Sequence, residues 1–351
     1  MTTTAVTRTD PEPPRENPAP GAGHWSWGHS FAVAGVIALV WEGWTFIAWL
    51  AQGPHALDQY RNENVSAWWG SILFETLIIV ISIPIAIHVI RGCLRTRRIT
   101  FDAKLCVAAL LAGWQDPLAN FAQPTFFYSS DWVNTNSWCG NVPLRVNPVC
   151  GAVPQPILFN FFEYAFGVLG LAIVFNAVMR AIKRRWPGIR PFQMALATLA
   201  FAMLIDVSLQ EPALHLRLWA FPNLPWSLLG TNVPYPLSDL FGFSPFFTSM
   251  ALLRFYKNDR DETFLDRDTR HLAPRWRFVL SLVAMVGFTN VVYTAFSLPD
   301  VLAAPYSTHM ATNLPAHLMN GVCTNGTTVK HSQYGLCPGM PGYRAPLRSV
   351  P

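Results

Sequence analysis

Long apolar segments dominate the sequence and constrain the fold more than any other feature. A helix that crosses a lipid bilayer needs about 20 mainly apolar residues. Such segments occur at roughly 30–52, 66–90, 105–123, 157–179, 192–216, 236–254 and 278–298. Because backbone polar groups in hydrocarbon must be bonded internally, the segments predict helices. The expected fold class is therefore all-α, a polytopic membrane bundle of about seven transmembrane helices.

Composition favours a membrane protein over a soluble enzyme. Charged residues make up only 13% of the 351-residue chain, whereas soluble domains carry about 25%. Residues 1–29 are polar and rich in proline, which predicts a disordered leader and no cleavable signal peptide. The transmembrane domain is expected at 30–298 and a tail at 299–351.

The distribution of positive charge predicts the orientation of the bundle. Most of the 25 Lys and Arg residues lie in three loops, at about 91–104, 180–191 and 255–277. Loops rich in Lys and Arg stay in the cytoplasm. The leader is therefore expected to be cytoplasmic, and the loop at about 124–156 and the tail extracytoplasmic. The sequence contains no folded basic domain of the kind that would indicate a nucleic-acid partner.

Cysteine positions agree with this orientation. Cys139 and Cys150 fall in the predicted outer loop, and Cys323 and Cys337 fall in the predicted outer tail, where an oxidising compartment permits disulfides. Each bridge would contribute about 3 kcal/mol in the entropic model. The alternative is four free thiols. Neither pair has histidine partners at metal-site spacing, so no zinc site is expected.

Seven carboxylates lie in or at the edge of the apolar segments, although a charge inside a bilayer costs about 2.5–3.5 kcal/mol on insertion scales. They are Glu42, Glu75, Asp116, Glu163, Asp206, Glu211 and Asp239. No Lys or Arg lies within the body of a predicted span, so ion pairs cannot neutralise most of these acids. All seven fall in the middle or outer half of the membrane. This bias predicts one cavity that opens outward or sideways to lipid.

Two proline motifs place carboxylates beside broken helix backbone. Gln115-Asp116-Pro117 in the third segment recurs as Gln210-Glu211-Pro212 in the fifth. Each proline should kink its helix and free a carbonyl, which is tolerated at membrane depth only against protein or a wet cavity. Aromatic and amide side chains that could contact a cation or bind hydroxyls there are Trp44, Trp114, Gln115, Asn120, Asn160, Tyr164, Gln210, Asn290 and Tyr293.

A structural role is the alternative for each of these residues taken singly. Glu42 could bond to a neighbouring helix, and Asp239 could cap one. Most tryptophans could anchor the chain at the lipid interface. Seven acids together nevertheless favour a functional cavity over a purely structural one.

Five stretches carry a resemblance to a known family. They are Trp114–Asn120, the aromatic loop from Phe126 to Trp138, Glu163-Tyr164, Tyr235–Asp239 and Leu253–Arg260. These stretches, spread over roughly 110–270, resemble the avermectin-type spiroketal cyclases, the AveC-like membrane proteins. The resemblance implies closure of a dihydroxyketone to a spiroketal, sometimes followed by dehydration. It transfers neither a particular substrate nor catalytic residues.

The implied chemistry suits the acids of this sequence. Spiroketal formation removes water from a hemiketal to give an oxocarbenium ion, which a second hydroxyl then attacks, so it needs an acid, a base and a shielding cavity. We expect Asp116 to protonate the leaving hydroxyl and Glu211 to accept the proton of the attacking hydroxyl. The other carboxylates are expected to tune these two (Asp206, Glu163 and Glu75) or to bind substrate (Glu42 and Asp239). No cofactor or metal is required.

Two other functions fit the same pattern. A terpene-type cyclase would also use a buried carboxylic acid and aromatic walls. A transporter or lipid-binding accessory protein would also place acids at mid-membrane, although the sequence lacks clear inverted halves. In each case the expected partners are a lipophilic small molecule and the lipid bilayer. The sequence predicts neither the substrate nor the oligomeric state.

Overall fold

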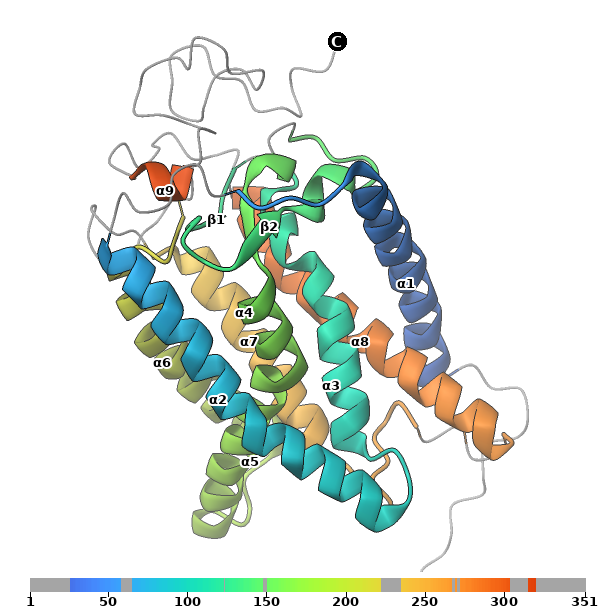
Figure 1. Cartoon of the computed structure of the whole chain (residues 1–351). Coiled ribbons are helices and arrows are strands. Elements are labelled where there is room, and N and C mark those ends of the chain that lie inside the picture. The colour runs from blue at the N-terminus through green and yellow to red at the C-terminus, as the bar shows by residue number, and fades with distance from the viewer. Residues whose placement is uncertain are drawn as a thin grey trace, which may run out of the picture.

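Helices form most of the chain in the computed structural model (Figure 1). The structure describes residues 26–57, 65–122, 124–147, 150–221, 235–266, 269, 272–303 and 315–319. Of the predicted disulfide cysteines, Cys323 and Cys337 lie outside these residues, as does most of the leader.

Five helical segments are long and apolar enough to cross a membrane. They are α1 (Trp27–Gln52), α2 (Val65–Thr96), α6 (Pro191–His215), α8 (Pro274–Ala303) and the continuous run of α4 (Ile157–Phe162), η4 (Glu163–Gly167) and α5 (Val168–Arg185). Large apolar side chains such as Ile47, Leu73 and Leu204 are exposed on their surfaces. Exposed apolar surface along long helices fits a membrane protein.

The two remaining predicted segments are helical but less clearly membrane-spanning. Residues 236–254 fall on α7 (Leu237–Phe255), and residues 105–123 fall on α3 (Phe101–Ala112) and the 3-10 helix η1 (Gly113–Asn120). α3 has only 12 residues, which is too short to cross hydrocarbon alone. The count of seven spans therefore stays a prediction.

The two proline motifs adopt different structures. Pro117 lies inside η1, which begins directly after α3 ends. The change from α-helix to 3-10 helix is consistent with the inability of proline to donate the hydrogen bond of an α-helix. Pro212 lies in the last turn of α6, which continues to His215. The third predicted segment is thus a broken helix, whereas the fifth is not.

Close backbone contact joins α1 to α8. Gly35 and Gly287 face each other, and a Cβ atom at Gly287 would overlap the backbone carbonyl of Phe31. Small residues that let backbones approach are a common device for packing helices in membranes. On its other faces α8 packs against α3 and α7, and α7 also contacts α5 and α6.

A cap of loops and short strands covers one end of the bundle (Figure 1). β1 (Phe127–Tyr128) pairs antiparallel with β4 (Trp219–Ala220), and β2 (Asn134–Asn136) pairs antiparallel with β3 (Pro154–Pro156). The short helices η2 (Trp138–Asn141), η3 (Cys150–Ala152) and α9 (Ala316–Met319) complete it. The expectation of an all-α fold missed these strands, because each is only two or three residues long.

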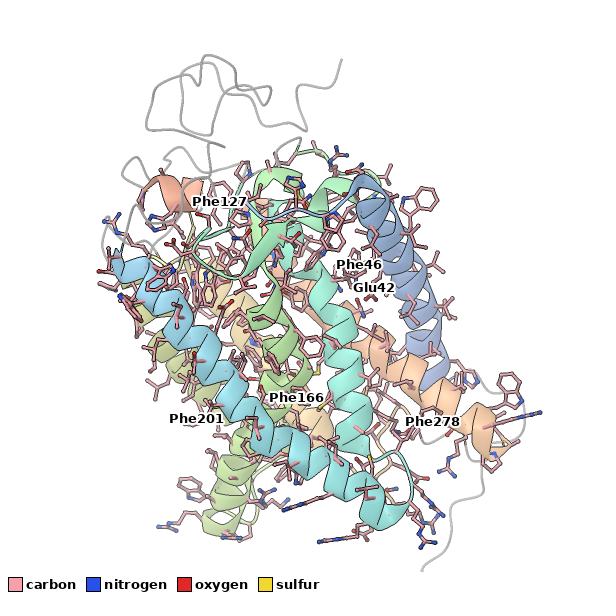
Figure 2. The ribbon with its side chains drawn as sticks, viewed as in Figure 1. Glu42, Phe46, Phe127, Phe166, Phe201 and Phe278 are labelled. Carbon is pink, nitrogen blue, oxygen red and sulfur yellow. A yellow bond between two sulfur atoms is a disulfide. The ribbon has the colours of Figure 1, made fainter. Side chains whose placement is uncertain are left out.

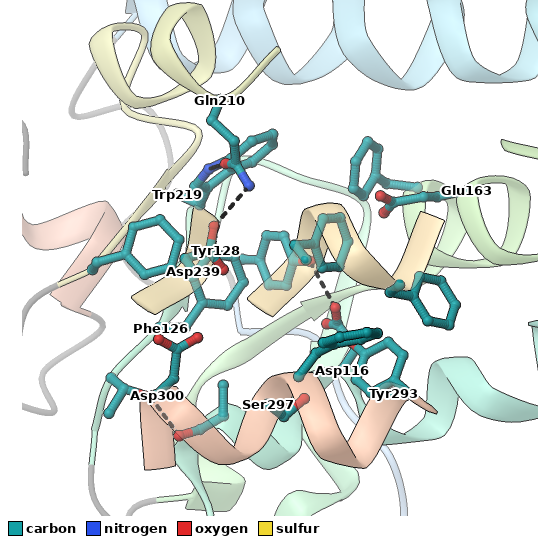
Figure 3. Close-up of a pocket in the computed structure, with 17 residues that line it drawn as sticks. Asp116, Phe126, Tyr128, Glu163, Gln210, Trp219, Asp239, Tyr293, Ser297 and Asp300 are labelled. Carbon is teal, nitrogen blue, oxygen red and sulfur yellow. Dashed lines mark hydrogen bonds between the residues drawn. The ribbon is translucent and has the colours of Figure 1, made fainter. Parts of the chain in front are cut away.

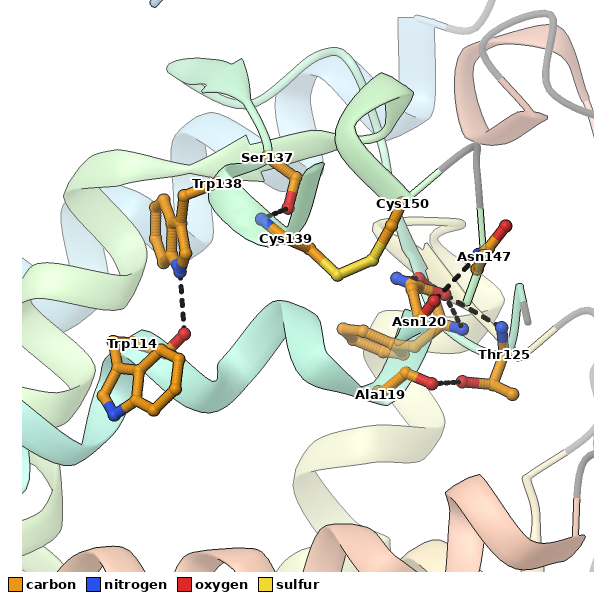
Figure 4. The surroundings of a disulfide bond; sticks show 10 residues. Trp114, Ala119, Asn120, Thr125, Ser137, Trp138, Cys139, Asn147 and Cys150 are labelled. Carbon is orange, nitrogen blue, oxygen red and sulfur yellow. Dashed lines mark hydrogen bonds between the residues drawn. A yellow bond between two sulfur atoms is a disulfide. The ribbon is translucent and has the colours of Figure 1, made fainter. Parts of the chain in front are cut away.

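Aromatic side chains form the core of the cap. The rings of Trp132 and Trp219 stack with centroids 6.3 Å apart, and Phe159 contacts both. A disulfide joins Cys139 and Cys150, whose Cα atoms are 5.3 Å apart (Figure 4). The predicted outer loop is therefore a folded unit.

Charged side chains gather at the opposite end (Figure 2). Arg254 donates hydrogen bonds of 2.9 Å to both carboxylate oxygens of Asp102 and a third to Asn176. His88 Nε2 lies 3.0 Å from the same Asp102 carboxylate. Arg254, at the C-terminal end of α7, thus links this helix to α3 and α5.

Candidate active site

The carboxylate of Asp116 accepts four hydrogen bonds. Its Oδ1 accepts from the hydroxyls of Tyr128 at 3.2 Å and Tyr164 at 2.8 Å. Its Oδ2 accepts from the amide nitrogens of Asn160 at 3.2 Å and Gln155. Every partner is a donor, and only 9% of Asp116 is exposed. These four donors match in number the acceptor capacity of a carboxylate.

These donors come from separate parts of the chain. Tyr128 is in β1 and Gln155 is in β3, so both belong to the cap. Asn160 is in α4, and Tyr164 is in the π-helix η4. π-helical turns are rare and occur frequently at functional sites. The carboxylate of Asp116 thus joins the cap to the bundle.

A cavity of about 80 Å³ lies beside Asp116 (Figure 3). The polar side chains that line it are Asp116, Thr125, Tyr128, Glu163, Gln210, Asp239, Tyr293, Ser297 and Asp300. Its aromatic wall consists of Phe126, Phe159, Trp219, Phe221, Phe243, Phe246 and Phe296. Aromatic rings around several carboxyls form a site that can shield a cation from water.

A second acidic group lines the cavity at Asp239 and Asp300. Asp239 Oδ2 accepts a hydrogen bond of 3.3 Å from Gln210, whose Oε1 accepts one of 2.7 Å from the Trp219 indole. Asp300 interacts electrostatically with Asp239, and its buried Oδ1 accepts no hydrogen bond within the described part of the chain. Because the two carboxyls line the same cavity and repel each other when both are charged, ionising both at once is unfavourable.

The structure brings together seven of the residues singled out in the sequence. Asp116, Glu163, Gln210 and Asp239 line the cavity. Asn160 and Tyr164 donate hydrogen bonds to Asp116 and are not themselves part of the cavity lining. Tyr293, also noted in the sequence, lines the cavity and lies 2.7 Å from the hydroxyl of Tyr164.

The expected pairing of Glu211 with Asp116 does not form. Glu211 is absent from the cavity lining, and its carboxylate lies 3.6 Å from His215. Adjacent residues on an α-helix point about 100° apart, so a helix that turns Gln210 toward the cavity turns Glu211 elsewhere. The proline motif of α6 therefore supplies an amide to the site and not the expected base.

Three further acids lie outside the lining. Glu75 on α2 accepts a hydrogen bond of 3.1 Å from the backbone N–H of Val133 in the cap. Asp206 on α6 accepts one of 3.0 Å from Ser244 on α7. Glu42 is buried on α1, one turn from Phe46 (Figure 2). The first two connect structural elements, as the structural alternative proposed.

The other predicted binding residues also serve the fold. Trp114 and Gln115 donate to the side chain of Asn290 on α8 at 2.9 and 2.7 Å. Asn120 binds the backbone of the loop that leads to β1. Trp44 is 65% exposed, which suits a lipid-facing anchor.

Sequence reasoning missed Tyr128 and Asp300. Tyr128 falls in the predicted outer loop, and only the pairing of β1 with β4 brings it over the cavity. Asp300 falls in the predicted tail, but α8 continues through Pro299 to Ala303. The apolar residues that follow Asp300 are the signal that could have extended the predicted helix.

Comparison with known proteins identifies the family. A family model described as "Spirocyclase AveC-like" matches residues 96–320. No curated protein and no solved structure matches the chain significantly. The matched range includes every residue that lines the cavity. The chain belongs to the AveC-like spirocyclase family.

Proposed function

We propose that this protein is a membrane-embedded cyclase that closes a lipophilic, polyketide-like hydroxyketone to a spiroketal by carboxylate chemistry. The observation that carries the proposal is a single aromatic cavity lined by two distinct acidic groups. One is the Asp116 carboxylate with its four donors, and the other is the Asp239 and Asp300 pair. Family membership supports spiroketal closure as the reaction.

The two acidic groups take different roles in this proposal. Asp239 and Asp300 hold a shared proton and act as the general acid. Asp116 is surrounded by donors and remains ionised, so it accepts protons and balances the charge of the oxocarbenium ion. This assignment reverses the role first expected for Asp116 and replaces Glu211. Glu163, which also lines the cavity, is available to bind a substrate hydroxyl.

The aromatic wall stabilises the cationic intermediate. Rings such as Phe243 and Phe246 present π-electrons to a positive charge. They also exclude water, which would otherwise capture the oxocarbenium ion and return the hemiketal. The net reaction converts one dihydroxyketone into one spiroketal and one water, and it needs no cofactor.

The test is comparative mass spectrometry of lipid extracts from cells that carry the wild-type gene or Asp116→Asn, with membrane levels matched. We expect a product to disappear and a species one water heavier to accumulate, with a rate loss of at least about a hundredfold. Asp131→Asn is the matched control, because Asp131 is a buried aspartate outside the cavity lining. A pair of equal mass would instead indicate a terpene-type cyclase. Unchanged extracts would indicate a transporter or lipid-binding protein.

A further inference from the structure

The hydrogen-bonding capacity of Asp116 is already used. An ionised carboxylate offers about four lone-pair positions. Tyr128 and Tyr164 occupy those of Oδ1, and Gln155 and Asn160 occupy those of Oδ2. A substrate hydroxyl therefore cannot donate to Asp116 without displacing a protein donor.

Two phenols connect this carboxylate to the cavity. Tyr128 lines the cavity and donates directly to Asp116. Tyr293 also lines the cavity, and its hydroxyl lies 2.7 Å from that of Tyr164. Because Tyr164 donates its only hydroxyl proton to Asp116, Tyr293 must be the donor in the tyrosine pair. Tyr128 and Tyr293 thus each keep oxygen lone pairs for a substrate hydroxyl.

We propose that Tyr128 and Tyr293 receive the protons of two substrate hydroxyls and pass them to Asp116. Tyr128 passes its proton directly, and Tyr293 does so through Tyr164. The inference rests on the proposed function and deepens it, because it requires a substrate with two hydroxyls, one for each phenol. Gln155 and Asn160 cannot relay protons in this way and act as positioning residues.

The steps balance as follows. The first hydroxyl oxygen bonds to the carbonyl carbon, its proton passes through one phenol to Asp116, and the acid pair protonates the carbonyl oxygen to give a hemiketal. The acid pair then protonates the hemiketal hydroxyl, which leaves as water. The second hydroxyl oxygen bonds to the resulting cation, and its proton passes through the other phenol. After each half-reaction Asp116 holds the proton of the attacking hydroxyl and the acid pair lacks its shared proton. Return of that proton from Asp116 to the acid pair through the cavity that both line resets the site before the next step. Over the cycle two protons leave the hydroxyls and two leave with the water oxygen.

The experiment uses phenylalanine variants of the full-length protein in membranes. The probe is the precursor that accumulates with Asp116→Asn, purified by its mass. We expect Tyr128→Phe, Tyr164→Phe and Tyr293→Phe each to lower turnover by at least about tenfold. The double variant of Tyr164 and Tyr293 should be no slower than either single variant, because both act in one path. The double variant of Tyr128 and Tyr293 should be slower than both singles.

Two readouts separate proton transfer from a structural role. Either Tyr128→Phe or Tyr293→Phe should accumulate the monocyclic hemiketal, which has the mass of the precursor but a different retention time. The proton inventory in mixed light and heavy water should change in Tyr164→Phe. Tyr256→Phe, at the end of α7 and outside the cavity lining, is the control and should match wild type.

The outcomes also separate this inference from the proposed function. Wild-type turnover in Tyr128→Phe and Tyr293→Phe, with Asp116→Asn inactive, would overturn the relay and leave the cyclase proposal standing. Failure of Asp116→Asn to accumulate any precursor would overturn both. Loss of activity with an unchanged proton inventory and no hemiketal would assign the tyrosines a structural role and reject the relay.

Discussion

The indole N–H of Trp138 donates a hydrogen bond of 2.7 Å to the backbone carbonyl of Trp114 (Figure 4). Trp138 directly precedes Cys139 of the disulfide, and Trp114 lies two residues before Asp116. The disulfide-bearing loop is thus tied directly to the 3-10 helix that carries the central carboxylate. The stability of the cap and the geometry of the cavity are therefore coupled.

Breaking the disulfide should loosen both the cap and the site. The bridge joins residues 11 apart in sequence, and a bridge around a loop of this size contributes about 3 kcal/mol. Replacing Cys139 and Cys150 with serine should therefore lower the melting temperature in detergent and reduce turnover. Replacing Cys93, which is unpaired, is the control. An unchanged melting temperature would show that the cap does not depend on the bridge.

Asn120 should control the position of the aromatic wall. Its Oδ1 accepts from the backbone N–H groups of Thr125 and Phe126 at 2.9 and 3.0 Å, and its Nδ2 donates to Phe126 O. Asn120→Ala leaves these groups unpaired at about 1–3 kcal/mol for each buried one. We expect lower thermal stability and lower turnover. Asn120→Asp retains the two acceptor contacts and should fall between alanine and wild type.

The contact between α1 and α8 should not tolerate a side chain at Gly287. Because a Cβ there would meet the carbonyl of Phe31, Gly287→Leu should separate the helices and reduce the folded fraction in size-exclusion chromatography. Gly43 lies on α1, the other helix of this contact, and nothing lies within 4 Å of an added Cβ there. Gly43→Leu is therefore the matched control. A normal elution profile for Gly287→Leu would contradict the close packing.

Asp266 should make stability depend on pH. Burial alone would raise the pKa of this carboxyl, but Lys104 and hydrogen bonds from Ser281 and Thr263 outweigh burial and hold the pKa below its usual value. A lowered folded pKa adds stability above the unfolded pKa of about 3.9, and that stability is lost as the pH falls through the folded pKa. The melting temperatures of wild type and Asp266→Asn should differ near neutral pH and converge below about pH 4. A constant difference would argue against the ionic contact.

The proposed orientation predicts which loops an impermeant reagent can reach. Leu144 in the cap is 83% exposed, and the basic residues at the end of α5 lie at the opposite end of the bundle (Figure 1). In a background that keeps the Cys139–Cys150 disulfide and lacks the other cysteines, Leu144→Cys should react with an impermeant maleimide in intact cells, and Arg184→Cys should react only after lysis. The reverse pattern would invert the orientation inferred from the basic loops.

The helices follow from the sequence because long apolar segments have few alternatives in a bilayer. The predicted segments overlap α1, α2, α6 and α8 closely, since each contains enough consecutive apolar residues to decide its structure locally. The boundaries are less certain. α8 extends past Pro299, where the helix carries Asp300 into the cavity.

The candidate site is only partly predictable, since its assembly depends on contacts between distant residues. The energetic cost of placing a carboxylate in an apolar segment singles out Asp116, Glu163 and Asp239, and all three line the cavity. The same criterion also selects Glu75 and Asp206, which hold the cap and neighbouring helices. Local sequence cannot separate these cases, because the difference lies in where each helix face points. The position of Tyr128 likewise depends on strand pairing across some 90 residues.

The π-helical turn η4 also changes the direction in which side chains point along the continuous helix that runs from α4 to α5. The turn holds one residue more than an α-helical turn, which offsets everything beyond it by about 100° around the axis. On one side of this offset Asn160 binds Asp116, and on the other Asn176 binds Arg254 at the charged end. One continuous helix therefore serves two polar sites that a uniform helix would present at a different relative angle. Deleting one residue of η4 after Tyr164 would rotate Asn160 and Asn176 relative to each other by about 100°, so the helix could no longer meet both sites at once.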